Sequence, residues 1–530
     1  MLTLSGRGES SLRSRLIMVV MAAMALLLAG MRPASAVPAV LYVDGGNPSC
    51  SDGGSGTDAV PFCTIKKGAT VAIAGQTVQV ASGTYQELVT FGHSGSPGSP
   101  IVLTAAPGAD VTVTGMANGF KVSGRSYVTV KNFTVTGTTS YGIYVASSSS
   151  NVTVSGNTVT STGSHGIYLT SLSTQVTVSG NTVRGATGYG IYVNTLSDVT
   201  VSGNTVADTT SYGIHVSGSS EVTVSGNDVS GAGERVSGST KYGIKLANTT
   251  ASLVSGNVSH DNSEAGVFLD ADTSGVEVTG NQTFGNARGY ARAAPGIDVR
   301  GFSNTIDRNV SHDNEDSGLQ FYTGSHDNLV VDNLSYFNGD HGIDDLGATN
   351  QRIIGNTVWW NYTAGINLEG SSTGATVMNN ISVDNGYNVS PCITPPPGEP
   401  DCSNDHRTRG NIRVDSTSTT GATVDYNLVY LTNPPDTMYV WGKTSYSSLS
   451  AFQATGQEAH GVQDDPSWVA AGSDFHLRSG SPAIDSANSG ASGETSTDLE
   501  GNARVDDPAT PNSGAGPRRY DDRGALEFQP

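Results

Sequence analysis

A four-residue phrase recurs through the middle of the chain: glycine, a branched apolar residue, a variable residue and a second apolar residue. It occurs, for example, at residues 142–145, 166–169 and 296–299. A second phrase, Gly-Asn or a close variant, alternates with the first, and its asparagines stand at positions 132, 157, 181, 204, 227, 257, 281, 309, 333, 356 and 380. Successive asparagines are 23 to 30 residues apart. A nearly constant period in this range predicts a solenoid, in which each repeat stacks on the next.

Within each repeat, short runs alternate between apolar and hydroxyl side chains, as in Val152-Thr153-Val154. Such short alternation is typical of half-buried strands, and Gly, Asn and Ser between the runs indicate turns. The sequence therefore predicts an all-β fold, a right-handed parallel β-helix with three short strands per coil and eleven or more coils. Coils of this kind lie about 4.8 Å apart, so the repeated asparagines are expected to form a ladder of amide hydrogen bonds.

The two ends of the repeat differ from its middle. Residues 37–120 are expected to hold an N-terminal cap and the first coils, with a short helix near 62–69, because the open end of a solenoid must be covered. Residues 121–430 carry the repeats. Beyond them the repeat fades, and residues 431–530 are expected to form a closing segment that packs on the last coil.

Residues 1–36 have the layout of a secretory signal peptide. Three arginines precede an apolar run at 16–29, and Ala34-Ser35-Ala36 offers a cleavage site with small residues. The apolar run is shorter than a full membrane span. We therefore expect a secreted, extracellular mature chain, and a membrane anchor is the alternative.

Charge and cysteine content narrow the partners and the compartment. The 530 residues include 27 basic and 47 acidic side chains, which gives a formal charge of −20. This excess of acid argues against nucleic acid as a partner. In an oxidising compartment, the local pairs Cys50–Cys63 and Cys392–Cys402 are the simplest of the three possible connectivities. We expect a monomer whose partner is an extracellular polysaccharide, with no membrane contact after cleavage of the leader.

Strand alternation places one row of residues on the outer face of the coils. If the branched apolar residue of each phrase points inward, the residue after it points outward, which gives the row Tyr144, Tyr168, Tyr192, His215, Lys245, Phe268, Asp298, Gln320, Asp344 and Asn367. The next outward position adds Arg300, Tyr322 and Glu369 among others, and Arg413 extends the row. The tyrosines either stabilise the stacked strands or form a platform for sugar rings.

The ionisable end of this face has the residue types that acid/base chemistry on a saccharide requires. Both signs of charge occur there together with histidine and tyrosine, although scattered charges are also typical of a solvated surface. The candidate catalytic residues are Lys245, Asp298, Arg300, Tyr322, His341, Asp344 and Glu369.

A second cluster, spread over adjacent coils, is rich in carboxylates. Crowded carboxylates repel one another unless they are protonated or bridged by a cation, and an oxygen-rich set suits Ca²⁺. The candidate calcium ligands are Asp313, Asp316, Asp340, Asp344 and Asp345. Aspartates held by hydrogen bonds in a purely structural role are the alternative.

Two stretches carry a resemblance to a known family. Leu-Tyr-Val-Asp at 41–44 and His-Asp-Asn-Glu-Asp-Ser-Gly-Leu-Gln at 312–320 resemble secreted bacterial β-helix proteins of the pectate-lyase-like superfamily, and in layout the family 9 polysaccharide lyases. The resemblance covers most of residues 40–390. It implies calcium held by aspartates and a lysine base on an outward strand position. The matching coil, 341–346, reads His-Gly-Ile-Asp-Asp-Leu, so Leu346 stands where the lysine is expected. Its Gly-Ile-Asp is also similar to the Gly-Phe-Asp-Pro-His motif of mannuronan epimerases.

These observations leave two classes of function open. The first is an enzyme that cleaves or epimerises a uronate-containing polysaccharide by abstracting the C5 proton. Ca²⁺ or Arg300 would neutralise the uronate carboxylate, and Lys245, His341 or Tyr322 would be the base. A glycoside hydrolase that uses two carboxylates of the same face is the enzymatic alternative. The second class is a non-catalytic surface protein that binds carbohydrate or mediates adhesion.

Overall fold

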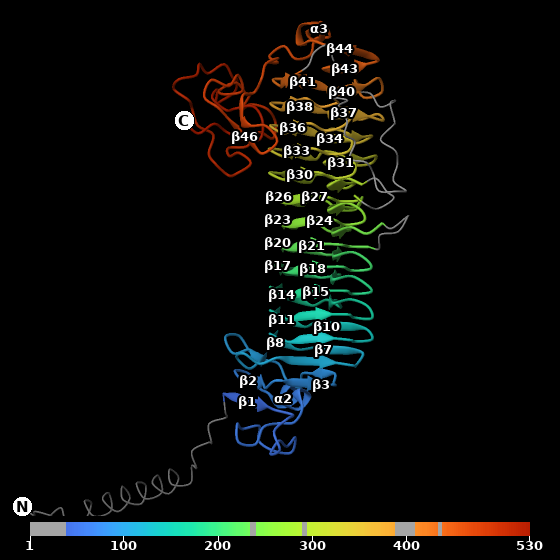
Figure 1. The fold of residues 1–530 in the computed structure, drawn as a ribbon, viewed down its shortest axis with the longest axis vertical. Coiled ribbons are helices and arrows are strands. Elements are labelled where there is room, and N and C mark those ends of the chain that lie inside the picture. The colour runs from blue at the N-terminus through green and yellow to red at the C-terminus, as the bar shows by residue number, and fades with distance from the viewer. Residues whose placement is uncertain (1–38, 234–239, 289–293, 387–408, 433–436) are drawn as a thin grey trace, which may run out of the picture. The chain divides into compact units, whose positions relative to one another are not determined.

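The computed structural model describes residues 39–233, 240–288, 294–386, 409–432 and 437–530, which form a parallel β-helix (Figure 1). Each coil contributes one strand to each of three sheets. Sheet 1 runs through 15 strands from β1 (Val40–Val43) to β41 (Thr423–Asp425), sheet 2 through 15 from β4 (Val89–Thr90) to β44 (Thr444–Tyr446), and sheet 3 through 14 from β3 (Gly83–Tyr85) to β42 (Leu428–Tyr430). The predicted fold class and number of coils are confirmed.

The interior is built from columns of apolar side chains in matching register. In sheet 2, β10 (Tyr141–Ala146) pairs in parallel with β13 (Ile167–Leu169), so Ile143 lies beside Ile167, and both are fully buried. The same register repeats from coil to coil, which keeps inward Val, Ile and Leu residues in contact along the solenoid. Burial of this apolar surface is the main force that holds the coils together.

The predicted asparagine ladder is present inside the turns. Each amide donates to the side-chain oxygen of the next coil, as when Asn181 Nδ2 donates to Asn204 Oδ1 over 2.9 Å. The ladder consists of Asn157, Asn181, Asn204, Asn227, Asn257, Asn281, Asn309, Asn333, Asn356, Asn380 and Asn427. The ladder ends at the buried side chain of Glu458, which accepts a hydrogen bond from Asn427 Nδ2. Burial raises the pKa of the Glu458 carboxyl group to about 8. Asn132 is not a member, because Phe133 occupies its place and Asn132 takes a left-handed turn position.

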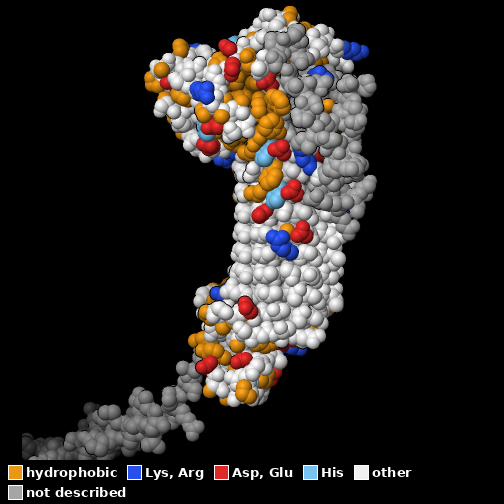
Figure 2. Space-filling model, viewed as in Figure 1, with side chains coloured by type: hydrophobic (Ala, Val, Ile, Leu, Met, Phe, Trp, Pro, Cys, Tyr) orange, Lys and Arg blue, Asp and Glu red, His pale blue; other side chains and the backbone are white. Residues whose placement is uncertain are grey.

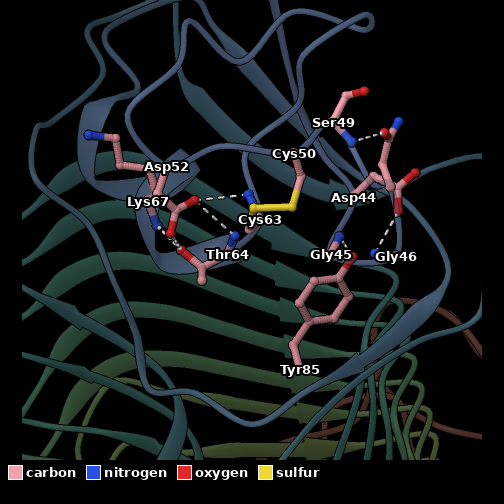
Figure 3. The surroundings of a disulfide bond; sticks show 11 residues. Asp44, Gly45, Gly46, Ser49, Cys50, Asp52, Cys63, Thr64, Lys67 and Tyr85 are labelled. Carbon is pink, nitrogen blue, oxygen red and sulfur yellow. Dashed lines mark hydrogen bonds between the residues drawn. A yellow bond between two sulfur atoms is a disulfide. The ribbon is translucent and has the colours of Figure 1, made fainter.

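The N-terminal end is closed by helix α2 (Ile65–Val71), close to the predicted capping helix. Thr64 caps the helix by accepting a hydrogen bond from the Lys67 amide. The predicted disulfide Cys50–Cys63 is present with an Sγ–Sγ distance of 2.02 Å (Figure 3). It fixes the loop before the helix to the first coil.

Other predictions for the termini and loops lie outside the described residues. These are the leader peptide at 1–36 and the pair Cys392–Cys402. Among the residues that the structure does describe, no helix has both the length and the apolar character to span a membrane.

The last coil is closed by a hairpin and a short helix. Strand β43 (Tyr439–Gly442) pairs with β44 in antiparallel orientation, and helix α3 (Leu449–Gln453) follows. The Phe452 ring stacks on that of Tyr439 with centroids 4.1 Å apart. Both rings are buried, so they cover the apolar end of the interior.

Residues 464–530, here named the C-terminal arm, contact the last coil as expected, since Arg523 Nη1 donates to Asn427 O, and they extend beyond it to earlier coils. They lie against sheet 3 and cross several of its coils (Figure 1). The Ala525 amide donates to Thr357 Oγ1 over 3.0 Å, and Arg504 Nη2 lies 2.8 Å from Asp332 Oδ1. The arm also forms its own apolar cluster with sheet 3, and its strands are β45 (Trp468–Ala470) and β46 (Asp474–Leu477). The arm thus braces the coils from the side.

The turn from sheet 3 to sheet 2 contains one residue of positive φ in successive coils. These residues are Gly137, Ser161, Gly185, Asp208, Gly231, Asp261, Gly285, Asp313, Phe337, Trp360 and Asp384. Most are Gly, Ser or Asp, which suit a left-handed turn. Phe337 at φ 56° and Trp360 at φ 53° are aromatic instead. Such a conformation costs a bulky L-residue about 1–2 kcal/mol, so these two coils carry local strain.

Candidate functional site

The outward row of sheet 2 is present as predicted. Register pairing in successive strands aligns Lys121, Tyr144, Tyr168, Tyr192, His215, Lys245, Phe268, Asp298, Gln320, Asp344, Asn367 and Arg413. Each residue follows an inward apolar residue, so alternation within the strand fixes its direction. The row changes from aromatic to ionisable along the solenoid.

The aromatic part of the row is a stack of rings. Tyr168 and Tyr192 have centroids 5.1 Å apart and planes 6° apart, and Tyr192 stacks on His215 at 4.9 Å. A second column beside it stacks His165 on Tyr189 at 4.7 Å. Burial lowers the pKa of His165 to about 4 and of His215 to about 3, so both stay neutral. Because each interior ring face is covered by the next ring, these columns stabilise the sheet and offer only ring edges to a ligand.

The next coils hold a cation within an aromatic cage. Lys245 Nζ lies 4.8 Å from the ring centre of Tyr212, 5.3 Å from that of Tyr242 and 5.1 Å from that of Phe268. Burial lowers the pKa of Lys245, and the nearby Arg300 charge adds to the effect. Cation–π attraction offsets part of the lost hydration.

Phe268 also contacts a second cation, Arg300. The guanidinium carbon lies 5.1 Å from the Phe268 ring centre and 4.6 Å from that of Tyr322. Arg300 Nη2 lies 3.1 Å from Asp298 Oδ2, and the Arg300 side chain is 39% exposed whereas that of Asp298 is 1% exposed. Buried Asp298 thus binds the guanidinium of Arg300 on its inner side, and the outer side of the guanidinium stays open to solvent.

Two coils further, Asp344 in β34 (His341–Leu346) is the centre of a buried polar network. Its carboxylate accepts hydrogen bonds from Gln320 Nε2 at 2.9 Å and from Asn367 Nδ2 at 2.7 Å. His341 Nε2 lies 3.9 Å from Asp344 Oδ1. One ligand atom each of His341, Asp344 and Glu369 lies within 4.8 Å of the other two. The structure therefore brings three of the predicted catalytic residues into one cluster.

Burial raises the pKa of Asp344, and the nearby carboxylates of Asp340 and Glu369 raise it further. A carboxyl group in this state keeps its proton to higher pH than usual and can serve as a general acid. Glu369, at the end of β37 (Ala364–Glu369), has a different environment, because its Oε2 lies 2.6 Å from Arg413 Nη1. The two carboxyl groups thus lie in different surroundings, Asp344 among amides and Glu369 against a guanidinium.

Three members of the network were not among the predicted catalytic residues. Gln320 and Asn367 bond to Asp344, and Arg413, from β40 (Gly410–Asp415), donates to Asn367 Oδ1 over 2.6 Å. That contact fixes the orientation of the Asn367 amide, since its oxygen must face the guanidinium. The three residues occupy the outward row, so their register with Asp344 was the available signal.

The remaining predicted residues lie apart from this cluster. Lys245, Asp298, Arg300 and Tyr322 form the cation and aromatic group described above, and Gln320 separates it from Asp344 along the row. The structure thus divides the seven predicted catalytic residues into two neighbouring groups on one face.

The five candidate calcium ligands do not surround one point. Asp345 pairs in register with core residues Phe321 and Leu368, on the opposite side of the strand from Asp344. It accepts a hydrogen bond from Ser372 Oγ at 2.9 Å, and burial raises its pKa well above the usual value. Asp313 lies at an exposed turn against His312. Asp344 and Asp345 cannot bind the same ion, because successive residues of a strand point to opposite faces of the sheet.

The three parallel sheets define the class of fold: the described coils form a right-handed parallel β-helix. Residues 109–229 match the family described as "Right handed beta helix region". Residues 235–394 match the family described as "Periplasmic copper-binding protein (NosD)".

One curated relative is the uncharacterized protein YwoF of Bacillus subtilis (strain 168). It is 30% identical over 123 residues, which covers 20% of this chain and 26% of that protein. The chain therefore matches about a quarter of the length of this relative.

Three solved structures are similar to the chain at low identity. XylC in complex with xylose is 13% identical, with a TM-score of 0.41 over 81% of this chain and 87% of that one. Pectate lyase Pel9A is 16% identical, with a TM-score of 0.36 over 92% and 96%. The A-module of Azotobacter vinelandii mannuronan C-5 epimerase AlgE4 is 15% identical, with a TM-score of 0.35 over 51% and 87%.

The copper in one family description raises the question of whether a metal fits this site. Among the described residues, the three groups of suitable ligand type that come together are His341, Asp344 and Glu369. Both oxygens of Asp344 already accept amide hydrogen bonds, and Glu369 faces the Arg413 guanidinium. A cation between them would meet N–H groups and a positive charge. The cluster in this arrangement does not fit a resident copper or calcium ion.

Proposed function

We propose that the protein acts on a uronate-containing polysaccharide, which it cleaves or epimerises by proton transfer at C5. The observation that carries this proposal is the position of Asp344. It is a carboxyl group with a raised pKa, held by two amides and grouped with His341 and Glu369, on a continuous outward row. A polysaccharide lying along the row from Lys245 to Glu369 meets cations, an acid and a base in turn.

The charges on this face suit an acidic sugar chain. Among the described residues, Arg413 is a cation in direct contact with the cluster, where it would offset the charge of the uronate carboxylate as its C5 proton leaves. Arg300, held by Asp298 and partly exposed, and caged Lys245 would bind carboxylates of neighbouring sugar units. These local cations matter because the chain as a whole carries a formal charge of −20.

In the proposed reaction, His341 is the base and protonated Asp344 is the acid. The C5–H bond breaks and its proton passes to the His341 imidazole, a common general base. In a lyase, the electron pair forms the C4–C5 double bond, the C4–O bond breaks, and the leaving oxygen takes the Asp344 proton. In an epimerase, a proton returns to C5 on the opposite face of the sugar. Tyr322 supports the Arg300 guanidinium from one side.

A second candidate, glycoside hydrolysis, is favoured by one distance. Oxygens of Asp344 and Glu369 lie within 4.8 Å of each other. Retaining glycosidases hold their two carboxyl groups about 5–5.5 Å apart. Asp344 would be the acid, and Glu369, paired with Arg413, would be the nucleophile. A non-catalytic carbohydrate-binding role remains the alternative to both reactions.

A product assay on polygalacturonate, alginate and glucuronoxylan distinguishes these functions. A lyase releases unsaturated sugars that absorb ultraviolet light, an epimerase changes the uronate composition without cleavage, and a hydrolase yields new reducing ends without absorbance. Binding without any product would support the non-catalytic role. Asp344→Asn should abolish any of the three reactions. Calcium assistance, expected from the sequence, is tested by running the assay with Ca²⁺ and with chelator, and the proposed steps do not depend on it.

We further propose that the protein works outside the cytoplasm. The Cys50–Cys63 disulfide supports this, because such bonds persist in oxidising compartments. The composition of the first 36 residues points the same way.

A further inference from the structure

The strained aromatic residues Phe337 and Trp360 lie close in sequence to the strands that carry the candidate site. Both residues lie in turns from sheet 3 to sheet 2, where equivalent coils use Gly, Ser or Asp. Four residues after Phe337 the chain reaches His341, and four residues after Trp360 it enters β37. Four residues span at most about 13–14 Å. The backbone of each residue therefore lies within about 14 Å of the start of a sheet 2 strand, β34 or β37, in the two coils that hold Asp344 and Glu369.

Phe337 and Trp360 lie at the edge of the apolar packing between sheet 3 and the arm, where both contact Trp359. Neither side chain is a member of the buried clusters, and both are partly exposed. Trp359, by contrast, packs on the C-terminal arm, with its ring centre 5.6 Å from that of Phe475. Hydrophobic side chains are prominent where the arm meets the coils in Figure 2. Phe337 also lies near the arm, because a Cβ on Gly472 would be 3.6 Å from Phe337 Cζ. Packing under the arm therefore accounts for Trp359 and in part for Phe337, and it leaves Trp360 unexplained.

The ring geometry also differs from that of the stabilising columns. The Phe337 and Trp360 centroids are 5.9 Å apart with planes at 85°, and Phe337 meets Trp359 at 60°. In the tyrosine columns the planes are nearly parallel, so interior faces are covered. An edge-to-face pair leaves ring faces available. Strain at exposed aromatic residues that do not support the core is an observation that points to a functional role.

We infer that Phe337 and Trp360 form a sugar-binding subsite at the rim of the sheet 2 site. Its occupant is a pyranose ring of the bound polysaccharide, one or two units from the reacting sugar. The C–H face of a pyranose is apolar and packs on an aromatic face, while its hydroxyl groups remain in water. The inference rests on the proposed function, since it assumes that the polysaccharide lies over Asp344 and Glu369. Adjacent coils lie about 4.8 Å apart, which places the two rings within reach of one sugar unit.

The test exchanges each aromatic residue for the glycine that other coils use. Phe337→Gly and Trp360→Gly relieve the left-handed strain, so the melting temperature should stay the same or rise. Loss of one aromatic contact should weaken binding of polygalacturonate or alginate fragments about tenfold. Calorimetric titration measures this, and KM should rise while kcat stays unchanged. Trp360→Phe should restore part of the affinity.

Trp359→Ala is the matched control, and it should lower the melting temperature because it opens the contact with the arm. The inference is overturned if Trp360→Gly binds like the wild type, if it destabilises the fold as much as Trp359→Ala, or if the protein binds no polysaccharide. Asp344→Asn separates the two proposals. Should the wild type bind fragments through Trp360 but form no product, the proposed reaction fails and the subsite stands.

Discussion

Arg413 Nη1 lies 2.6 Å from Glu369 Oε2, although the two residues are 44 positions apart in the chain. The same nitrogen donates to Asn367 Oδ1, and the Asn367 amide in turn donates to Asp344. One guanidinium thus pairs with the Glu369 carboxylate and, through the Asn367 amide, orients a hydrogen bond to the Asp344 carboxylate. This relationship makes Arg413 the positioning group of the proposed acid/base centre.

We predict that Arg413→Ala lowers kcat about 10²–10³-fold, because both the amide orientation and the local positive charge are lost. Arg413→Lys should recover part of the rate, since it keeps the charge but not the fork of donors. Arg184→Ala is the control, because Arg184 forms an exposed ion pair far along the solenoid. Equal rates for Arg413→Ala and the wild type on an identified substrate would remove Arg413 from the site.

Asp344→Asn should abolish activity and stabilise the fold at neutral pH. Burial raises the pKa of Asp344, so the folded state holds the proton more tightly than the unfolded state. The Asp344 carboxyl group therefore destabilises the fold least at a pH below about 4, the pKa of an aspartate in the unfolded chain. Stability is lost as the pH rises from that value through the raised folded value. Asparagine stays neutral throughout.

Melting curves at several pH values check this prediction. Asp344→Asn should melt above the wild type at pH 7–8 and close to it near pH 3. A variant that melts below the wild type at neutral pH would show that the carboxylate is stabilising, in contradiction to the raised pKa.

The β-helix coil and the outward row could both be predicted from the sequence, because both follow from short periods in the chain. The row includes Asp344 and Glu369 for that reason. Asp345 was misjudged, since adjacent strand residues face opposite sides and cannot share one ion. Gln320 and Asn367 also belong to the row, but an amide side chain does not indicate by its type that it bonds to Asp344. The contact of Arg413 with Asn367 spans 46 positions, and no local pattern reveals it.

Divalent metal ions should not stabilise the protein. Millimolar Ca²⁺ or equimolar Cu²⁺ should leave the melting temperature equal to that in chelator, because a ligand that binds only the folded state would raise it. The reason is that Asp344 and Glu369 already face N–H donors and a guanidinium. A clear rise that Asp344→Asn removes would show that the network opens to bind the metal.

Asn204→Ala should lower stability without affecting the site. Asn204 Nδ2 donates to Val178 O and to Asn227 Oδ1, and its own oxygen accepts from Asn181. Loss of a buried partner costs about 1–3 kcal/mol. Asn194→Ala, on the outer face of the same coil, should change stability by less than about 0.5 kcal/mol. Chemical denaturation measures both, and similar losses for the two variants would argue against the ladder.

The final prediction concerns the C-terminal arm. Arg504 is fully buried and contacts Asp332 of the coils as well as Glu494 and Glu527 of the arm, at 2.8, 3.4 and 3.1 Å. Arg504→Ala leaves these carboxylates buried without their cation, and breaking a buried ion pair in this way costs about 3–5 kcal/mol. We expect the arm to separate from sheet 3 first, because the apolar interior of the coils does not include Arg504.

Limited proteolysis followed by mass spectrometry should then detect cleavage within residues 464–530 at temperatures where the wild type resists. Arg519→Ala serves as control, since Arg519 is an exposed arginine of the same arm. Adding Asp332→Asn to Arg504→Ala should recover part of the stability, because it removes one uncompensated charge. Protease resistance of Arg504→Ala equal to that of the wild type would mean that the apolar contacts alone hold the arm against the coils.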